Sequence, residues 1–194
     1  MSCPIPLLKN KQAADFVFFL TEVNMYTVGD KVLDSQGYIF VVESIEEKDF
    51  GNGPENYLVL APCFAYDFNA GFKKFVPESK ADTALNCILT EDQAIALIDG
   101  LKNIKPFDEI TPHERKNFFQ SILVHSDRET VCRIIKTLVI SKQTRLALHK
   151  SVSDYDQRLL KNLLNRLELE LSISLNQPKE QVASVVEQNL GIAG

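Results

Sequence analysis

The chain has 194 residues, is 45% hydrophobic and carries a net charge of −5. This size allows one or two ordinary hydrophobic cores, and no apolar run is long enough to cross a membrane. Residues 1–100 hold 7 basic and 15 acidic residues, whereas residues 101–150 hold 10 basic and 5 acidic residues. The net charge of +5 in the second segment is a feature of surfaces that face nucleic acid, and also of solvated helices.

The residues that usually carry chemistry are scattered. The cysteines form no CxxC pair, which argues against a zinc site or a redox motif, and we expect reduced thiols in a cytoplasmic protein. They are Cys3, Cys63, Cys87 and Cys132. The histidines lie near predicted helix ends and form no ligand set: His113, His125 and His149. We therefore expect no catalytic residues, no metal, no cofactor and no small-molecule substrate.

Residues 1–24 do not match the pattern that follows them. They hold two lysines and an apolar run at 16–20 that is too short for the apolar region of a secretion signal. Met25 then begins a clear strand pattern. One interpretation is that Met25 is the natural start and that residues 1–24 are an upstream extension. The alternative is a short N-terminal helix that packs on the body.

Residues 25–89 have the pattern of a small β module. Segments rich in β-branched and aromatic residues predict strands at 26–33, 38–45, 57–60 and 72–76, with a short fifth strand at 85–89. The sequence Gly51-Asn52-Gly53-Pro54 is a strong turn signal. Short strands at this spacing predict an SH3/Tudor-like β-barrel, a fold that leaves a strand edge or a rim loop free for a partner.

From Thr90 onward the hydrophobic period is helical. Capping patterns predict five helix starts, at Thr90, Thr111-Pro112, Ser126–Glu129, Ser153–Asp156 and Pro178. The expected fold class is α+β, with a small N-terminal β-barrel followed by a C-terminal all-α bundle of short helices. We expect four segments: the extension 1–24, the β module 25–89, a helix and linker 90–110, and a helical domain 111–192.

Basic residues on the predicted helices are candidates for contacts with phosphates, because lysine and arginine neutralise phosphates without reading sequence. Phe107 follows Pro106 in a loop between two helices. An aromatic ring at such a place is suited to wedge into a DNA minor groove. Both features have an equally open alternative, in which the charges serve solubility and Phe107 anchors the linker to the bundle.

Several segments resemble the CarD family of bacterial transcription regulators. The stretch Tyr26–Val32 resembles the opening of that family's RNA-polymerase-interacting domain, and Gly37 with residues 38–47 resembles its second strand and acidic shoulder. Residues 56–60 resemble the third strand, and 75–77 the strand and proline that close the barrel. Residues 126–138 and 153–164 are similar to the family's C-terminal helical domain. The resemblance covers roughly residues 25–190 and depends on order and spacing.

This resemblance implies a non-enzymatic regulator with two partners. The β module would bind the β subunit of RNA polymerase, and the helical module would contact promoter DNA weakly, in the minor groove, and modulate the stability of the open complex. The implied polymerase contacts are Lys48, Lys74 and Phe75. For DNA, the resemblance points to Arg115, Lys116 and Arg158, and residue chemistry adds Phe107 and Lys150.

Two departures from the family pattern weaken the DNA half of this prediction. The proline and histidine that usually precede the first hairpin glycine are replaced in Leu33–Gly37, and the family's DNA-wedging tryptophan is missing because the chain has no tryptophan. Phe107 is the nearest counterpart but lacks an indole N–H donor. The alternative function is a Tudor/SH3-like adaptor that binds a protein without DNA contact, for which the net charge of −8 in residues 1–100 would matter more.

Overall fold

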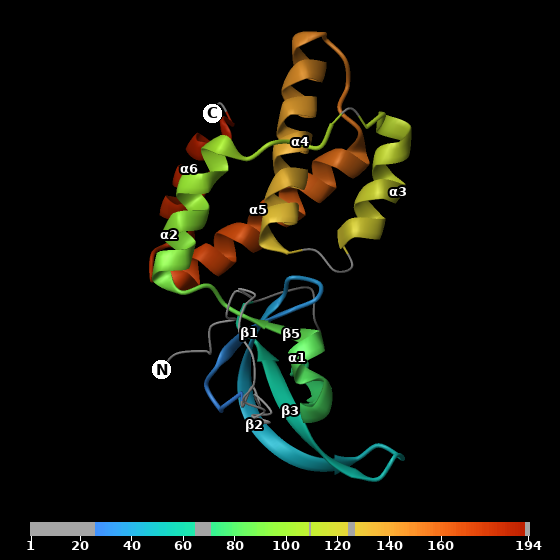
Figure 1. The fold of residues 1–194 in the computed structure, drawn as a ribbon, viewed down its shortest axis with the longest axis vertical. Coiled ribbons are helices and arrows are strands. Elements are labelled where there is room, and N and C mark those ends of the chain that lie inside the picture. Colours follow the sequence, from blue (N-terminus) through green and yellow to red (C-terminus); the bar gives the residue numbers. More distant parts are fainter. Residues whose placement is uncertain (1–25, 65–70, 109, 124–126, 193–194) are drawn as a thin grey trace, which may run out of the picture. The chain divides into compact units, whose positions relative to one another are not determined.

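The computed structural model describes residues 26–64, 71–108, 110–123 and 127–192, so the expectations for residues 1–24 lie outside the described residues. The chain divides into two compact units between Ile88 and Leu89 (Figure 1). The first unit contains a β-sheet and the second is helical, which confirms the predicted α+β class. No helix in the described part of the chain is long and apolar enough to cross a membrane.

The first unit is built on a five-stranded antiparallel sheet. Its strands are β1 (Lys31–Asp34), β2 (Ile39–Asp49), β3 (Pro54–Pro62), β4 (Lys74–Pro77) and β5 (Leu85–Cys87). A 3₁₀ turn η1 (Glu78–Lys80) and a short helix α1 (Ala81–Ala84) connect β4 to β5. The strand order is β4-β3-β2-β1-β5, so β4 and β5 lie at opposite edges of an open sheet. The predicted closed barrel is therefore not confirmed, since closure requires hydrogen bonds between the two edge strands.

One face of this sheet carries the core of the first unit. In β3, Leu58 and Leu60 are fully buried in that core, while Tyr57 and Val59 alternate onto the opposite face. The pairing of β2 with β3 shifts between Val42 and Ser44, which marks a β-bulge. Such a bulge changes the alternation of the side chains that follow it in β2.

A buried carboxylate braces the first hairpin. Asp34 is 3% exposed, and its Oδ1 accepts hydrogen bonds from the backbone N–H groups of Gln36 and Tyr38, each at 2.9 Å. Its Oδ2 accepts a hydrogen bond from Lys74 Nζ at 2.7 Å. Asp34 thus connects the β1–β2 turn to the edge strand β4, and the buried charge is satisfied on both oxygens.

The described part of the second unit contains five helices and a 3₁₀ turn. They are α2 (Glu91–Gly100), η2 (Leu101–Asn103), α3 (Pro112–Leu123), α4 (Arg128–Ala147), α5 (Asp154–Ser174) and α6 (Lys179–Leu190). The capping box at Thr90 and the N-cap at Ser153 are confirmed. Helix α4 begins instead behind Asp127, whose carboxylate accepts a hydrogen bond from the Thr130 N–H. Ser126 lies outside the described residues.

Three of these helices end in the same backbone motif. A residue with left-handed backbone closes each of α4, α5 and α6: His149 at φ 53°, Asn176 at φ 50° and Gly191 at φ 73°. In α4 the N–H of Lys150 donates to the carbonyl of Arg145, and the N–H of His149 donates to that of Leu146. This is the Schellman arrangement, which satisfies the last carbonyls and reverses the chain direction.

The core of the helical unit draws on all of its long segments. Ala94, Ile98 and Leu101 from α2 and η2 are buried in the same cluster as residues of α4, α5 and α6. The described residues of the segment that we expected as a helix and linker, 90–110, therefore pack in the helical unit. One ion pair of this unit has a buried carboxylate: Arg128 donates through Nε and Nη2 to Oε1 of the buried Glu170.

The described cysteines differ in burial. Cys63 is half-buried and Cys132 is fully buried, and both are free thiols. Burial, with smaller contributions from nearby carboxylates, raises the pKa of Cys132 to about 12, so this residue acts as a small apolar core residue. Cys87, on β5, is partly buried against the core of the first unit.

A second buried carboxylate on α5 is poorly compensated. Glu168 is 7% exposed, and its only ion pair among the described residues, with Lys179, has an N–O distance of 3.3 Å. Burial raises the pKa of Glu168 above its ordinary value, and the hydrogen bond and charge of Lys179 only partly oppose this shift. In the unfolded chain the carboxyl loses its proton at the ordinary pKa. The folded state therefore binds this proton more tightly, and stability falls as pH rises from that value through the raised pKa.

We expect Glu168→Gln to remove the loss of stability that comes from burying a charged carboxylate. At pH 4 both proteins carry a neutral side chain and should have similar stability. Near pH 7 the variant should be more stable than the parent, because no buried charge remains. Thermal unfolding across this pH range measures the difference. The exposed neighbour change Glu180→Gln is the control, and an equal pH-dependent gain in that variant would contradict the explanation.

Candidate functional site

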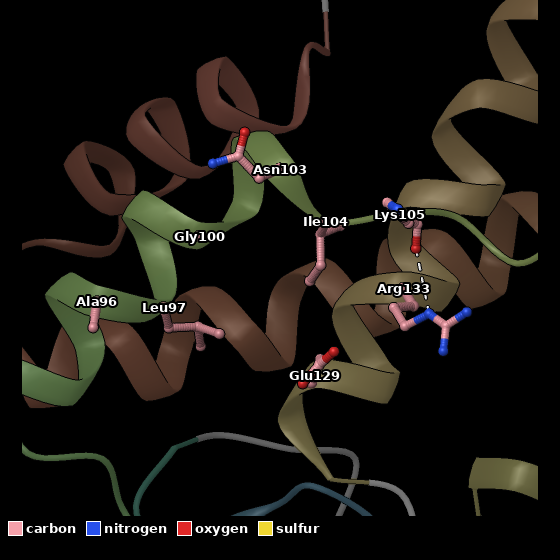
Figure 2. Close-up of a pocket in the computed structure, with 8 residues that line it drawn as sticks. All are labelled: Ala96, Leu97, Gly100, Asn103, Ile104, Lys105, Glu129 and Arg133. Carbon is pink, nitrogen blue, oxygen red and sulfur yellow. Dashed lines mark hydrogen bonds between the residues drawn. The ribbon is translucent and has the colours of Figure 1, made fainter.

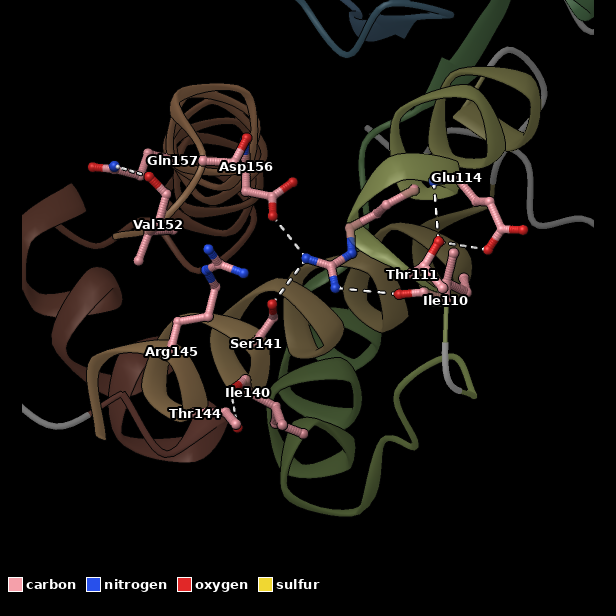
Figure 3. Close-up of polar contacts among 12 residues, drawn as sticks. Ile110, Thr111, Glu114, Ile140, Ser141, Thr144, Arg145, Val152, Asp156 and Gln157 are labelled. Atoms are coloured by element: carbon pink, nitrogen blue, oxygen red, sulfur yellow. Dashed lines mark hydrogen bonds and ion pairs between the residues drawn. The ribbon is translucent and has the colours of Figure 1, made fainter. Parts of the chain in front are cut away.

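Arg115 connects the N-terminal ends of α3 and α5 with the C-terminal half of α4. Figure 3 shows Asp156 of α5 and Ser141 of α4, the two side chains that accept its hydrogen bonds. This arginine is 6% exposed, and its Nη1 donates to Asp156 Oδ2 at 2.7 Å and to Ser141 Oγ at 2.8 Å. Its Nη2 donates to the carbonyl oxygen of Ile110 at 3.4 Å. Asp156 is also 6% exposed. The buried Arg115 guanidinium therefore connects three helices, through the ion pair with Asp156 and the hydrogen bond to Ser141.

This position corrects the prediction for Arg115. Its guanidinium is engaged with other protein groups, and its Nε is buried without a hydrogen-bond partner. A phosphate cannot reach such a group without breaking the ion pair to Asp156. The sequence held a signal for this outcome, because Arg115 is four residues before the fully buried Phe119 and so lies on the apolar face of α3. The acidic partner, 41 residues away, carried no comparable signal.

Lys116 lies beside the ion pair but faces solvent. Its Nζ is 5.9 Å from the centre of the Tyr155 ring, a cation–π contact between the first turns of α3 and α5. Tyr155 is half-buried, and burial followed by the charge of Asp156 raises the pKa of its hydroxyl. The hydroxyl therefore stays neutral and available as a hydrogen-bond donor. Sequence reasoning missed Tyr155, which has no periodicity or motif that marks it.

Three further cations surround the start of α5. Lys150 and Arg158 are exposed, and Arg145 is half-buried with its Nε donating to the carbonyl of Ser151 at 2.6 Å. We call Lys116, Arg145, Lys150 and Arg158 the cationic surface. None of the four forms an ion pair with a carboxylate of the described residues.

The backbone reinforces the charge of the cationic surface. Ser153 caps α5, and its hydroxyl accepts a hydrogen bond from the Asp156 N–H. The first turn of a helix presents the positive end of its dipole and unpaired N–H groups, so it favours anions. Four cations without described carboxylate partners beside this helix start form an arrangement that suits phosphate groups.

Phe107 is held in the helical core and not presented to a partner. Its ring is 5.3 Å from that of Phe118, and its backbone N–H donates to Thr137 Oγ1 at 2.9 Å. The guanidinium of Arg133 lies 4.2 Å from the centre of the ring. Phe107 therefore anchors the segment before α3 to the bundle, and this packing is not compatible with the predicted wedge.

Lys74, the second predicted polymerase contact, also serves the fold. Besides its ion pair with the buried Asp34, its Nζ lies 5.5 Å from the centre of the Phe40 ring, in the sheet core. In β4 it pairs with Leu60, and directly opposite residues project on the same side of a sheet. Lys74 therefore points to the inner face, and a partner protein cannot use its charge without disrupting the hairpin.

Phe75 has the opposite orientation and remains a candidate contact. It pairs with Val59 on the outer face, is 41% exposed, and its ring is 5.8 Å from that of Phe50. Phe50 is 59% exposed and packs edge-on against Tyr57 at 4.9 Å. We call Phe50, Tyr57 and Phe75 the aromatic patch. Sequence reasoning missed Phe50, which lies directly before the turn Gly51-Asn52-Gly53.

Lys48 lies on the same face of the sheet. It is half-buried and forms an ion pair with Glu46, which lies two positions before it on β2, with an N–O distance of 2.7 Å. Hydrogen bonds from Lys48 and then from Ser44 lower the pKa of Glu46, so that carboxylate stays charged. The outer face therefore combines exposed aromatic rings with both signs of charge.

The helical unit also has a surface hollow of about 630 Å³ between α2, η2 and the start of α4 (Figure 2). It is lined by Ala96, Leu97, Gly100, Asn103, Ile104, Lys105, Glu129 and Arg133. Arg133 is already committed, because its Nε donates to the Lys105 carbonyl and its guanidinium covers Phe107. None of the predicted contact residues lines this hollow.

Within the described residues, no group of three or more histidine, cysteine, aspartate or glutamate side chains is placed to hold a metal ion. No protein-family model matches the chain, and no curated protein matches it. The CarD resemblance therefore stays a prediction from the residues.

The structure separates the roles of two neighbours on α3, which mutation can test. Arg115→Ala should lower the free energy of unfolding by about 3–5 kcal/mol, because it leaves Asp156 buried without its partner. Lys116→Ala should change it by no more than about 0.5 kcal/mol, because that side chain is exposed. Urea unfolding measures both. The double change Arg115→Met with Asp156→Leu should recover most of the loss, and equal losses in the two single variants would refute the assignment.

Proposed function

We propose that the protein is a CarD-like bacterial transcription regulator, which binds RNA polymerase through its first unit and promoter DNA through its second. The observation that carries this proposal is the cationic surface, with four basic side chains that have no described carboxylate partner. A surface of this kind in a protein of net charge −5 needs an explanation beyond solubility. A regulator of transcription would act in the bacterial cytoplasm, which is the proposed location.

The DNA contact would be mainly electrostatic. Lys116, Lys150 and Arg158 are exposed and suited to neighbouring phosphates, with the start of α5 adding its dipole. Arg115 supports them indirectly, since its ion pair fixes the first turns of α3 and α5 relative to each other. Few phosphate contacts give weak binding, which is consistent with a factor that modulates an open complex already held by polymerase.

The polymerase contact would use the outer face of the sheet. The aromatic patch offers apolar area and rigid rings, which dominate the energetics of protein interfaces. Phe75 lies on β4, an edge strand of the described sheet, and an edge can pair with a strand of a partner. Lys48 and Glu46 would form a polar rim beside the rings. We assign this face to the contact with the polymerase β subunit. We also propose that the sheet is an open relative of the Tudor fold.

An adaptor that binds another protein without DNA is the second candidate. The exposed pair Phe50 and Phe75 favours it as much as the first, because such a patch suits any apolar partner. The cationic surface discriminates between the two functions. An adaptor has no DNA association, whereas a regulator loses DNA steeply as salt rises.

The proposed DNA contact predicts that reversing the charge of two exposed lysines weakens DNA binding. The parent should bind a fluorescent promoter duplex with an affinity that falls as salt rises. Lys116→Glu with Lys150→Glu should weaken binding at least tenfold and reduce the salt slope by about 2, roughly 0.9 per lost phosphate contact. Lys102→Glu, an exposed lysine of η2, is the matched control. Equal losses in the control, or no binding by the parent, would contradict the assignment.

The proposed polymerase contact predicts that a substitution on the outer face of the sheet, but not on the other face, weakens binding to RNA polymerase. Phe75→Ser in the full chain should reduce capture of purified RNA polymerase by about tenfold or more, as is usual for a central interface aromatic. Ile45→Ser is a matched control, because Ile45 has a similar exposed fraction, 39%, but pairs with Leu58 on the other face. Interferometry with immobilised polymerase measures both. Equal effects in the two variants would rule out the outer face.

A further inference from the structure

The hairpin of β2 and β3 extends past the neighbouring strands of the described sheet (Figure 1). Its register runs to the pair Asp49–Pro54, whereas β4 pairs with β3 only from Tyr57 to Leu60. The four residues that join the two strands, 50–53, are all exposed. The tip of the hairpin is therefore accessible to water and to reactions that need water.

The tip contains the only Asn-Gly pair of the chain, Asn52-Gly53. An asparagine carboxamide and the backbone nitrogen of the next residue can join in a five-membered ring, and glycine has no Cβ to obstruct their approach. No described atom beyond the chain neighbours lies within 4 Å of the place that a Cβ would take at Gly53. Among the described residues, no hydrogen bond holds the Asn52 carboxamide away from this nitrogen.

Asp49 places a carboxylate beside the same nitrogen. Its Oδ1 accepts hydrogen bonds from the backbone N–H of Gly53 at 3.1 Å and from that of Gly51 at 2.7 Å. Both glycines have left-handed backbone, with φ 94° and φ 99°, a conformation that glycine adopts readily. A general base must lie within hydrogen-bond distance of the proton that it removes, and Asp49 meets this condition for the Gly53 N–H.

We propose that Asn52 is a self-modification site, at which the hairpin converts its own asparagine into an acidic residue with Asp49 as the base. The Gly53 nitrogen attacks Cγ of Asn52 and forms a C–N bond. Asp49 accepts the proton of that nitrogen and returns it to Nδ2, which leaves as ammonia when the Cγ–Nδ2 bond breaks. Water then opens the succinimide ring. Cleavage of its bond at Cγ gives aspartate, and cleavage at the backbone carbonyl gives isoaspartate.

Either product changes the surface next to the aromatic patch. It adds a negative charge two residues after Phe50, at a tip where Glu47 and Asp49 are already exposed. Isoaspartate also lengthens the main chain of the loop by one CH₂ group. A charge at the rim of an interface mainly changes the rate of association. The conversion therefore weakens the contact of this patch as the protein ages, a consequence that rests on the proposed polymerase contact, whereas the modification itself does not.

Peptide mass spectrometry of the full chain, after incubation in neutral buffer, tests the modification. Asn52 should be replaced by a mixture of aspartate and isoaspartate. Asn56, whose Nδ2 donates to Glu78 Oε2 at 3.2 Å, should keep its amide.

Two substitutions on β2 test the role of the base. Asp49→Asn should slow the conversion about tenfold or more, because the amide oxygen still accepts both hydrogen bonds but cannot take the proton. Glu47→Gln removes the same charge two positions earlier and should match the parent. An intact Asn52 in the parent overturns the proposal, and so does a conversion in Asp49→Asn that is as fast as in the parent or faster.

Capture by immobilised RNA polymerase tests the consequence separately. The incubated parent should bind several-fold more weakly than fresh parent, whereas Asn52→Ser, which cannot form the ring, should bind equally before and after incubation. If fresh parent binds and the converted parent binds as well, the consequence is refuted while the modification stands. If fresh parent does not bind polymerase, the proposed function fails and this consequence fails with it, and the mass spectra still decide whether Asn52 is modified.

Discussion

The buried ion pair between Arg115 and Asp156 is the constraint on which the candidate surface depends. Both groups are 6% exposed, and their contact joins the first turn of α3 to the first turn of α5, with Ser141 of α4 as a third partner. A buried carboxylate tolerates little freedom in its partner, because any displacement leaves a charge unpaired in a poorly solvated site. Because the ion pair holds α3 and α5 in place, it also fixes the positions of Lys116 and Arg158, although neither residue touches it.

The sheet shows the same relation on a smaller scale. Asp34 is buried, so Lys74 must turn inward to meet it, and Phe75 then faces outward by the alternation of the strand. The aromatic patch is thus exposed partly because its neighbour is committed to the core. In both units, a cation that seemed available from the sequence stabilises a carboxylate, and the side chain next to it takes the exposed position.

Several elements followed from local sequence patterns. All five strand regions were predicted, as were the capping box at Thr90 and the N-cap at Ser153, because strand periodicity and helix capping depend on residues only a few positions apart. The candidate site was predicted less well. Lys116, Lys150 and Arg158 are exposed as expected, but Arg115 and Lys74 are engaged in the fold and Phe107 is packed, because each of these meets a partner that lies far away in the chain.

The sequence by itself determined the α+β class, the order of elements and the concentration of positive charge in residues 101–150, since these depend on composition and local period. Only the tertiary structure decided which cations are free, which aromatic ring is exposed, and that the sheet stays open with β4 and β5 at its edges. The physical reason is that burial and ion pairing are long-range properties. A charged side chain is available for a partner only after the buried groups of the fold have been satisfied.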